Sequence, residues 1–431
     1  MRLFRFYNTC TSKLASLVFA AVVCSVGFSG AVVAGDEIGP FQKTDWSCWR
    51  GLNHDGIATP QQAPMSWSET ENIAWKVNIP GRGYGSPIVV GKFIYLATAD
   101  KEKQTRSLIC INKKTGKREW KCDVHTGKST PPRNKKGTQA SSTPACDGKR
   151  LFINFLHDDA MYTSAVDLKG NILWQTRITG YVVHQGYGSS PAMYGPLVIV
   201  SADNKSGGAI AGLNRETGKI VWKVKRPEMP NYPSPIILKA AGKTQLIMTG
   251  CEKVSSFEPL TGKVNWEVEG ATTECVTSTI TDGKLVFTSG GYPKNHVSAV
   301  KADGSGELAW EKKTRVYVPS MFVYQNALFA VADAGIAYCW ENATGKELWK
   351  GRLAGTFSSS PVLVGNKIYV TNETGETFIY RASKDQFELL GKNQLGNECF
   401  ATPTFSGKRI YMRVANGAGK DRQEVLYCIS E

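Results

Sequence analysis

The sequence predicts an all-β protein: a single eight-bladed β-propeller with four antiparallel strands per blade. Three recurring features support this prediction: a nine-residue pattern, the spacing of the tryptophans that close it, and a small residue followed by proline. Near-copies of the nine-residue pattern read "NKKTGKREW" (112–120), "NRETGKIVW" (214–222), "EPLTGKVNW" (258–266) and "ENATGKELW" (341–349).

The closing tryptophans give the length of one repeat. They are Trp75, Trp120, Trp174, Trp222, Trp266, Trp310 and Trp349. The gaps between them are 45, 54, 48, 44, 44 and 39 residues, and a degenerate copy ends at Leu390, 41 residues after the last tryptophan. Periods of about 40–50 residues are typical of propellers and solenoids.

The second landmark is a small-residue–proline pair that begins an apolar strand, in phase with the tryptophans. Examples are "SPIVVGKFIYLATAD" (86–100) and "SPVLVGNKIYVTN" (360–372). The units at 278–290 and 320–333 lack the proline, and together the landmarks mark eight units. Each unit contains four short strands, with "TGK" as the turn before the fourth.

The repeated tryptophan has a structural explanation. One four-stranded blade cannot bury both of its faces, so every blade needs the same device to dock on its neighbour. An indole buries about 150–250 Å², which at about 25 cal/mol/Å² is at most about 4–6 kcal/mol. We therefore interpret the seven tryptophans as blade-docking residues without a catalytic role.

The two ends of the repeat region predict how the ring closes. The last unit stops at "QEVLYCISE" (423–431) without a TGK turn or a tryptophan strand, and a surplus tryptophan strand lies at 71–81. We expect this N-terminal strand to complete the eighth blade beside the C-terminal strand, because a closed ring leaves no free sheet edge.

The first 34 residues differ from the rest. Arg2, Arg5 and Lys13 precede an uncharged apolar run that ends in "VVA" before Gly35. This order predicts a secretory signal peptide at 1–34, followed by an N-terminal extension (35–70) and the propeller (71–431). The alternatives are an uncleaved membrane anchor and a lipoprotein start at Cys24. The nine cysteines after the leader are interpreted mainly as small buried hydrophobic residues, with one or two disulfides as the alternative.

The repeat resembles the pyrroloquinoline-quinone-type propeller repeat, in which D-x-x-T-G-K-x-x-W recurs around eight blades. The resemblance covers residues 71–431 and implies the fold more strongly than an activity. It points to two relatives: the quinone-dependent alcohol and sugar dehydrogenases, and a non-catalytic propeller lipoprotein that helps to assemble outer-membrane β-barrels. The length after the leader is similar to that of the second.

A quinone dehydrogenase implies a calcium ion held by oxygen ligands, a catalytic aspartate and a vicinal cysteine pair. This chain has no Cys-Cys. Glu274 and Glu398 each precede an innermost strand and are expected at the funnel, with solvated rim charges as the alternative, and Asp203 and Asp333 are expected to cap turns. The five histidines share no close spacing, so we predict neither a metal site nor a catalytic residue.

Two regions are candidate binding sites. The loops before the innermost strands form the predicted funnel, where aromatic side chains favour a peptide or sugar, or else plug the channel. The candidate funnel residues are Tyr84, His184, Tyr187, Tyr232, Glu274, Tyr317, Phe357 and Glu398. The second region is the basic stretch 101–136, which holds twelve Lys or Arg against three acidic residues. Its candidate residues are Lys128, Arg133, Lys135 and Lys136.

The basic stretch is expected to meet an anionic surface component, or else to be a solvated loop. We therefore predict an exported, monomeric scaffold of the periplasm or cell envelope that binds an envelope protein or an anionic surface component. It needs no cofactor, binds no nucleic acid, and associates with a membrane only if the leader is uncleaved. The alternative is a dehydrogenase that uses pyrroloquinoline quinone and calcium.

Overall fold

A computed structural model describes residues 37–58 and 62–431. The chain divides into two units, Met1–Ala34 and Gly35–Glu431. The leader and its alternatives therefore lie outside the described residues. Within the described ranges, no helix is long and apolar enough to cross a bilayer.

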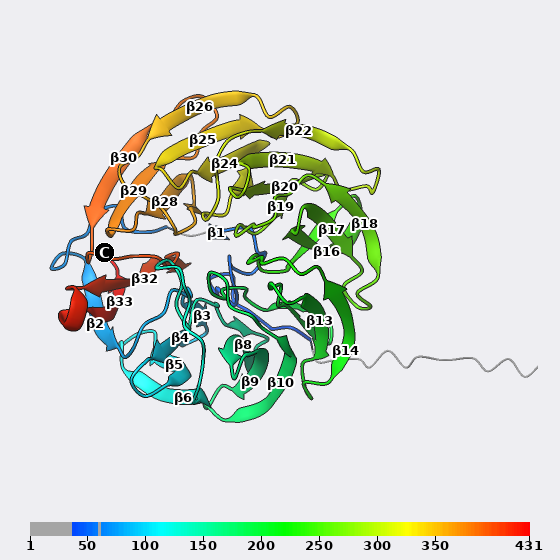
Figure 1. Ribbon diagram of the computed structural model, residues 1–431. Coiled ribbons are helices and arrows are strands. Elements are labelled where there is room, and N and C mark those ends of the chain that lie inside the picture. Colours follow the sequence, from blue (N-terminus) through cyan, green and yellow to red (C-terminus); the bar gives the residue numbers. More distant parts are fainter. Residues whose placement is uncertain (1–36, 59–61) are drawn as a thin grey trace, which may run out of the picture. The chain divides into compact units, whose positions relative to one another are not determined.

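Eight four-stranded antiparallel blades form a ring, which confirms the predicted fold class (Figure 1). The first four blades are β3 (Ile88–Val90), β4 (Phe93–Asp100), β5 (Thr105–Asn112), β6 (Arg118–Thr126); β7 (Ala145–Cys146), β8 (Arg150–His157), β9 (Ala160–Asp167), β10 (Ile172–Gly180); β11 (Ala192–Tyr194), β12 (Leu197–Ser201), β13 (Gly208–Asn214), β14 (Ile220–Arg226); and β15 (Ile236–Ala240), β16 (Lys243–Gly250), β17 (Lys253–Phe257), β18 (Val264–Glu269).

The next three blades are β19 (Ile280–Thr281), β20 (Leu285–Gly290), β21 (His296–Lys301), β22 (Leu308–Lys312); β23 (Phe322–Tyr324), β24 (Ala327–Val331), β25 (Ile336–Glu341), β26 (Glu347–Arg352); and β27 (Val362–Val364), β28 (Lys367–Thr371), β29 (Glu376–Arg381), β30 (Leu389–Gln394). The eighth is β31 (Thr404–Ser406), β32 (Arg409–Asn416), β33 (Gln423–Ile429) and β2 (Ile73–Ile79), with a short 3-10 helix at Gly419–Asp421.

The eighth blade closes the ring as predicted. β2 pairs antiparallel with β33, from Ile73 opposite Ile429 to Ile79 opposite Glu424. The first long strand and the last strand of the chain therefore share one sheet.

The tryptophans join neighbouring blades through both packing and hydrogen bonds. Six indole N–H groups donate to a backbone carbonyl of the next blade over 2.7–3.2 Å, for example Trp222 to Pro259. Trp266 differs: it donates to Gln245 Oε1 at 2.9 Å, and Gln245 Nε2 donates to Ala302 O of the next blade at 3.0 Å. Gln245 thus relays this docking contact.

The glycine of the TGK turn serves two purposes. Gly262 has φ +69°, and in the preceding repeat Asn214 Oδ1 accepts the turn N–H groups of Glu216 and Thr217. The glycine also lies against an indole: a Cβ on Gly262 would approach Trp222 Cε3 to 2.4 Å. The turn must therefore lack a side chain for the preceding tryptophan to dock.

The degenerate copy at Leu390 is accompanied by a different tryptophan. Trp67, from the segment before β2, is buried in the core cluster against which Leu390 packs. The Trp67 backbone N–H donates to Asn393 Oδ1 at 3.0 Å. The N-terminal segment therefore supplies an indole at the blade that lacks one.

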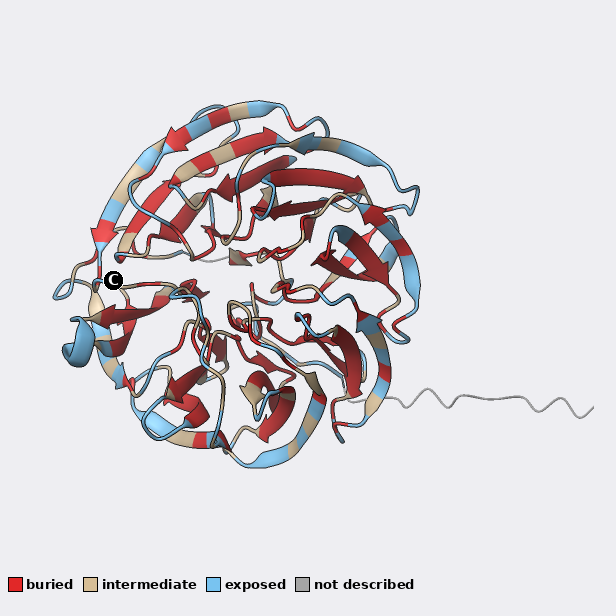
Figure 2. Cartoon of the chain, viewed as in Figure 1, coloured by how far each residue is buried: buried red, intermediate tan, exposed pale blue. Residues whose placement is uncertain are grey.

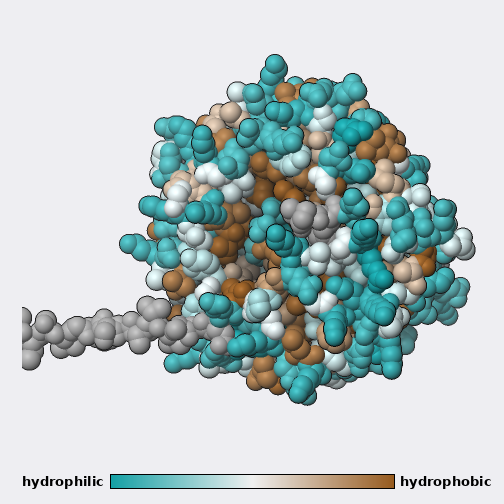
Figure 3. Space-filling model, turned by 180° about the vertical axis from the view of Figure 1, so that it is seen from behind, coloured by the Kyte–Doolittle hydropathy of each residue, from teal (hydrophilic) through white to brown (hydrophobic). Residues whose placement is uncertain are grey.

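Burial follows the blade structure. The inner strands are almost entirely buried, whereas the outermost strands alternate between buried and exposed residues (Figure 2). Seen from the reverse side, hydrophobic residues gather toward the middle of the ring and hydrophilic residues cover the outside (Figure 3). All nine cysteines in the described part of the chain are buried and free.

The N-terminal extension runs beside the innermost strands, which the sequence did not predict. Trp46 forms a bridge with Val89 of the first blade, and Arg50 donates to Met321 O of the sixth at 2.6 Å. The extension then forms β1 (Ile57–Ala58), which adds a parallel fifth strand to β27 of the seventh blade, near the centre of the ring (Figure 1). Residues 37–58 therefore cross the channel from one side to the other.

Candidate functional site

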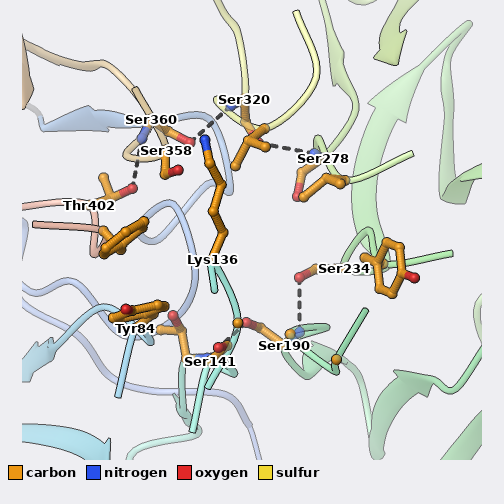
Figure 4. Close-up of a pocket in the computed structure, with 18 of the residues that line it drawn as sticks. Tyr84, Lys136, Ser141, Ser190, Ser234, Ser278, Ser320, Ser358, Ser360 and Thr402 are labelled. Atoms are coloured by element: carbon orange, nitrogen blue, oxygen red, sulfur yellow. Dashed lines mark hydrogen bonds between the residues drawn. The ribbon is translucent and has the colours of Figure 1, made fainter. Parts of the chain in front are cut away.

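A ring of hydroxyl side chains surrounds the channel where the innermost strands begin. Each blade contributes one serine or threonine, in six cases the residue of the small-residue–proline landmark. The members are Ser86, Thr143, Ser190, Ser234, Ser278, Ser320, Ser360 and Thr402. In seven of the eight steps around the ring, the backbone N–H of one member donates to the side-chain oxygen of the next over 2.9–3.1 Å (Figure 4).

The extension closes one end of this ring. Ser278 Oγ accepts the indole N–H of Trp49 at 2.9 Å. The extension pairs with the innermost strands three residues beyond the hydroxyl ring, at Val89 and Leu363, so Trp49 lies at the end opposite the loops. The result is a cup of about 350 Å³ with Trp49 as its floor.

The loops before the innermost strands form the rim of the cup. Tyr84, Tyr187, Tyr232 and Tyr317 all line it, as the sequence placed them. Tyr84 stacks on Phe400 with ring centroids 4.2 Å apart, although Phe400 had not been singled out from the sequence.

Phe357 does not belong to this rim, which corrects its predicted place. It is 0% exposed and lies in the core cluster of the sixth and seventh blades, where its ring packs on Phe378. An aromatic residue before an innermost strand can point into either the channel or the core, and the sequence does not separate the two.

Glu274 is buried rather than solvated. It is 4% exposed, its Oε1 lies 3.1 Å from His184 Nε2, and its Oε2 accepts the Tyr317 hydroxyl at 3.4 Å. Burial and the nearby Glu274 carboxylate raise the pKa of both Tyr232 and Tyr317. These tyrosines are therefore protonated hydrogen-bond donors and not bases.

Glu398 is paired with cations of its own chain. Its Oε1 accepts Arg422 Nη2 at 2.6 Å and the Tyr84 hydroxyl at 3.2 Å, and Arg82 lies 3.3 Å away. Burial opposes ionisation, but the hydrogen bonds from Arg422 and Tyr84 and the charges of Arg422 and Arg82 together outweigh it, so the pKa of Glu398 is lowered. Burial and the Glu398 charge raise the pKa of Tyr84 to about 12.

Asp203 and Asp333, which were expected to cap turns, lie in different environments. Asp203 is buried and bound to Arg226 at 3.2 Å and to Asn231 at 3.2 Å, so it joins a core ion pair. Asp333 Oδ2 accepts the backbone N–H of Tyr317 at 2.7 Å, a loop contact, and Asp333 also lines the cup.

The basic side chains of the 127–139 loop line two different cavities. Lys136 reaches into the cup and lies 2.5 Å from Glu373 Oε1 of the seventh blade, so the loop spans the mouth (Figure 4). Lys128 pairs with Asp159 at 3.0 Å. Arg133 and Lys135 face a second hollow on the other side of the loop. The sequence grouped these four residues, but the chain bends and turns at 133–136, and the neighbours Lys135 and Lys136 line different cavities.

The residues at the cup do not fit a calcium-bound quinone. Calcium requires about six to eight oxygen ligands. Within residues 37–58 and 62–431, no group of three or more His, Cys, Asp or Glu side chains is placed to hold a metal ion. The carboxylates of Glu274, Glu373 and Glu398 are each engaged by a cationic or histidine side chain of the same chain.

Comparison with known proteins gives a family and a fold. The family model of "Outer membrane protein assembly factor BamB" matches residues 57–155, 133–316 and 293–385. Over 114 residues, 26% of this chain, the chain is 30% identical to the outer membrane protein assembly factor BamB of Legionella pneumophila. Over 357 residues, 71% of this chain, it is 23% identical to tetrathionate hydrolase of Acidithiobacillus ferrooxidans. The matches span 29% and 66% of those relatives.

Solved structures share the fold. Quinohemoprotein alcohol dehydrogenase from Comamonas testosteroni has a TM-score of 0.66 at 14% identity, covering 89% of this chain and 80% of that one. BamB from Moraxella catarrhalis has a TM-score of 0.58 at 13% identity, covering 82% and 96%. At these identities the likeness concerns the propeller alone.

Proposed function

The chain belongs to the family of the outer membrane protein assembly factor BamB, and we propose that it is an exported, monomeric binding scaffold of the cell envelope whose cup holds an extended segment of a partner protein. The predicted leader delivers it to the periplasm or cell envelope, and an uncleaved leader would hold it at a membrane. The family's name points to a partner that takes part in outer-membrane protein assembly.

The composition of the cup supports binding without turnover. Tyrosines and Phe400 wall the rim, and aromatic side chains are frequent in the anchoring positions of protein interfaces. In seven of the hydroxyl-ring members the side-chain oxygen already accepts a backbone N–H of a neighbouring blade, so its own O–H is free to donate toward the axis. An extended peptide offers carbonyl acceptors for such donors.

The single observation that carries this proposal is that Glu274 and Glu398, the two carboxylates predicted at the funnel, are both bound by side chains of the chain itself. A general base must be free to take a proton from a substrate. Glu274 and Glu398 instead accept hydrogen bonds and cations from the chain itself. Their role is to fix the rim, and Glu398→Gln should leave binding within about twofold, because Arg422 keeps its bond to Glu424 at 2.9 Å.

Calorimetry tests the proposal. Synthetic peptides with the sequences of outer-membrane β-barrel strands are titrated into the purified chain. Tyr317→Ala should weaken binding at least tenfold, because it removes an aromatic wall. Tyr324→Ala, outside the cup, is the matched control. Equal affinity in the two variants would place the peptide elsewhere.

A second set of assays tests for turnover. The chain is mixed with pyrroloquinoline quinone and calcium, and absorption and dye reduction are followed with alcohols and aldoses. A parallel sample is given tetrathionate. A saturable spectrum with dye reduction, or loss of tetrathionate, would refute the non-catalytic role.

A further inference from the structure

We propose that the hollow on the outer side of the 127–139 loop binds an acidic polysaccharide. This basic groove has a volume of about 560 Å³ and lies between the loop and the β4–β5 turn. It is a site separate from the cup, and the inference does not depend on the proposed function.

All charged side chains that line the groove are cations. Six of its lining side chains are positively charged, and none of its lining residues is acidic. The six are Arg82, Lys101, Arg106, Lys128, Arg133 and Lys135. A concave surface of one charge sign concentrates ligands of the opposite sign.

Three of these cations have nothing to neutralise them. Arg82 and Lys128 are paired with Glu398 and Asp159. Among the residues that the structure describes, Lys101, Arg133 and Lys135 form neither an ion pair nor a side-chain hydrogen bond, and all three are exposed. Their positive charge is available to a ligand.

The remaining cation of the groove, Arg106, gives the strongest indication that an anion binds here, because its charge is buried without a counter-charge among the described residues. It is 1% exposed, and its guanidinium donates to Gln104 O at 3.0 Å and to Gly127 O at 2.7 Å, and its Nη2 lies 2.6 Å from His157 Nδ1. No carboxylate contacts it in the described part of the chain, and its Nε has no hydrogen-bond partner there. A buried charge without a counter-charge is costly, and an anion in the groove would offset that cost.

The rest of the lining selects the class of ligand. It consists of small, hydroxyl, amide and proline residues, without an aromatic ring. A single-stranded nucleic acid needs aromatic platforms for its bases, and a lipid needs an apolar surface for its acyl chains. Hydroxyls and amides such as Ser129, Thr138 and Gln139 suit a hydroxyl-rich chain, and the cations suit its carboxylate or sulfate groups.

The test uses the full chain and two triple variants of equal charge. The groove variant is K101Q/R133Q/K135Q. The control variant is K219Q/K263Q/K346Q, three exposed lysines of the TGK turns. Because all six side chains are exposed, both proteins should fold, and thermal unfolding is recorded for each.

Binding to heparin and to polygalacturonate is measured by interferometry at 50 and 200 mM salt, with dextran as the uncharged comparison. We expect the groove variant to lose at least tenfold in affinity at 50 mM salt and to depend less on salt, and the control to lose less than twofold. Equal losses in the two variants would mean that net charge alone attracts the glycan, and this would overturn the proposal. Tighter binding of poly-L-glutamate than of either glycan would also overturn it, in favour of an acidic protein.

Discussion

The contact between the TGK glycine and the tryptophan of the preceding blade can be tested by adding one methyl group. Gly262→Ala places a Cβ 2.4 Å from Trp222 Cε3, well inside van der Waals contact. Gly407→Ala is a matched control, because Gly407 has φ +66° against +69° for Gly262, and a Cβ there would meet nothing within 4 Å.

The two substitutions share one cost and differ in the other. Both force alanine into the left-handed region, at about 1–2 kcal/mol. Only Gly262→Ala also overpacks the blade interface, which adds about 1–3 kcal/mol. We therefore expect Gly262→Ala to lower the free energy of unfolding by about 2–5 kcal/mol and Gly407→Ala by about 1–2 kcal/mol.

Urea unfolding followed by circular dichroism measures both losses, with the slope compared to detect partial unfolding of single blades. A double-mutant cycle with Trp222→Ala isolates the contact, because the extra cost of Gly262→Ala should vanish once the indole is gone. Equal losses at Gly262 and Gly407, or an unchanged cost without the indole, would show that the turn needs glycine for its backbone conformation only.

Two further predictions concern buried or bridging charges. His296 is 2% exposed without a partner for either ring nitrogen in the described residues, and burial lowers its pKa from 6.5 to about 4. Protonation therefore favours the unfolded chain, so stability should fall by up to about 3 kcal/mol between about pH 6.5 and pH 4, and His296→Leu should remove that part of the pH dependence in urea titrations. The bridge from Lys136 to Glu373 holds the loop across the cup, and because it is partly exposed it contributes about 1 kcal/mol. Glu373→Gln, which removes the bridge and keeps every tryptic site of the loop, should accelerate tryptic cleavage within 127–139 about fivefold, whereas an unchanged rate would mean that the loop is held by other contacts.

The sequence was sufficient for the ring because every blade solves the same packing problem. Trp120, Trp222 and Trp349 each donate an indole hydrogen bond to a backbone carbonyl of the next blade. The interpretation of one repeat therefore applies to the others. Closure by β2 followed from a missing strand at one end and a surplus strand at the other. Tyr84, Tyr187, Tyr232 and Tyr317 line the cup because each lies two or three residues before the hydroxyl residue that precedes an innermost strand.

The features that could not be predicted from the sequence lie in segments that are not repeated, namely the N-terminal extension and the 127–139 loop. Trp49 and Arg50 contact residues more than 200 positions away, and no periodicity marks a chain that crosses a channel. The destination of Lys136 depends on a partner, Glu373, that no spacing connects with it. The hydroxyls of the landmark were visible, but their links around the ring exist only once the blades stand side by side.

The pairing of β2 with β33 has a consequence for how the protein is made. About 340 residues separate the two strands, so bringing them together costs about 5 kcal/mol of chain entropy before any contact repays it. β2, the first long strand to be synthesised, therefore stays without its partner until β33 has been made. Until β33 has been synthesised, the eighth blade is incomplete, and an exposed strand edge is an aggregation hazard during that interval.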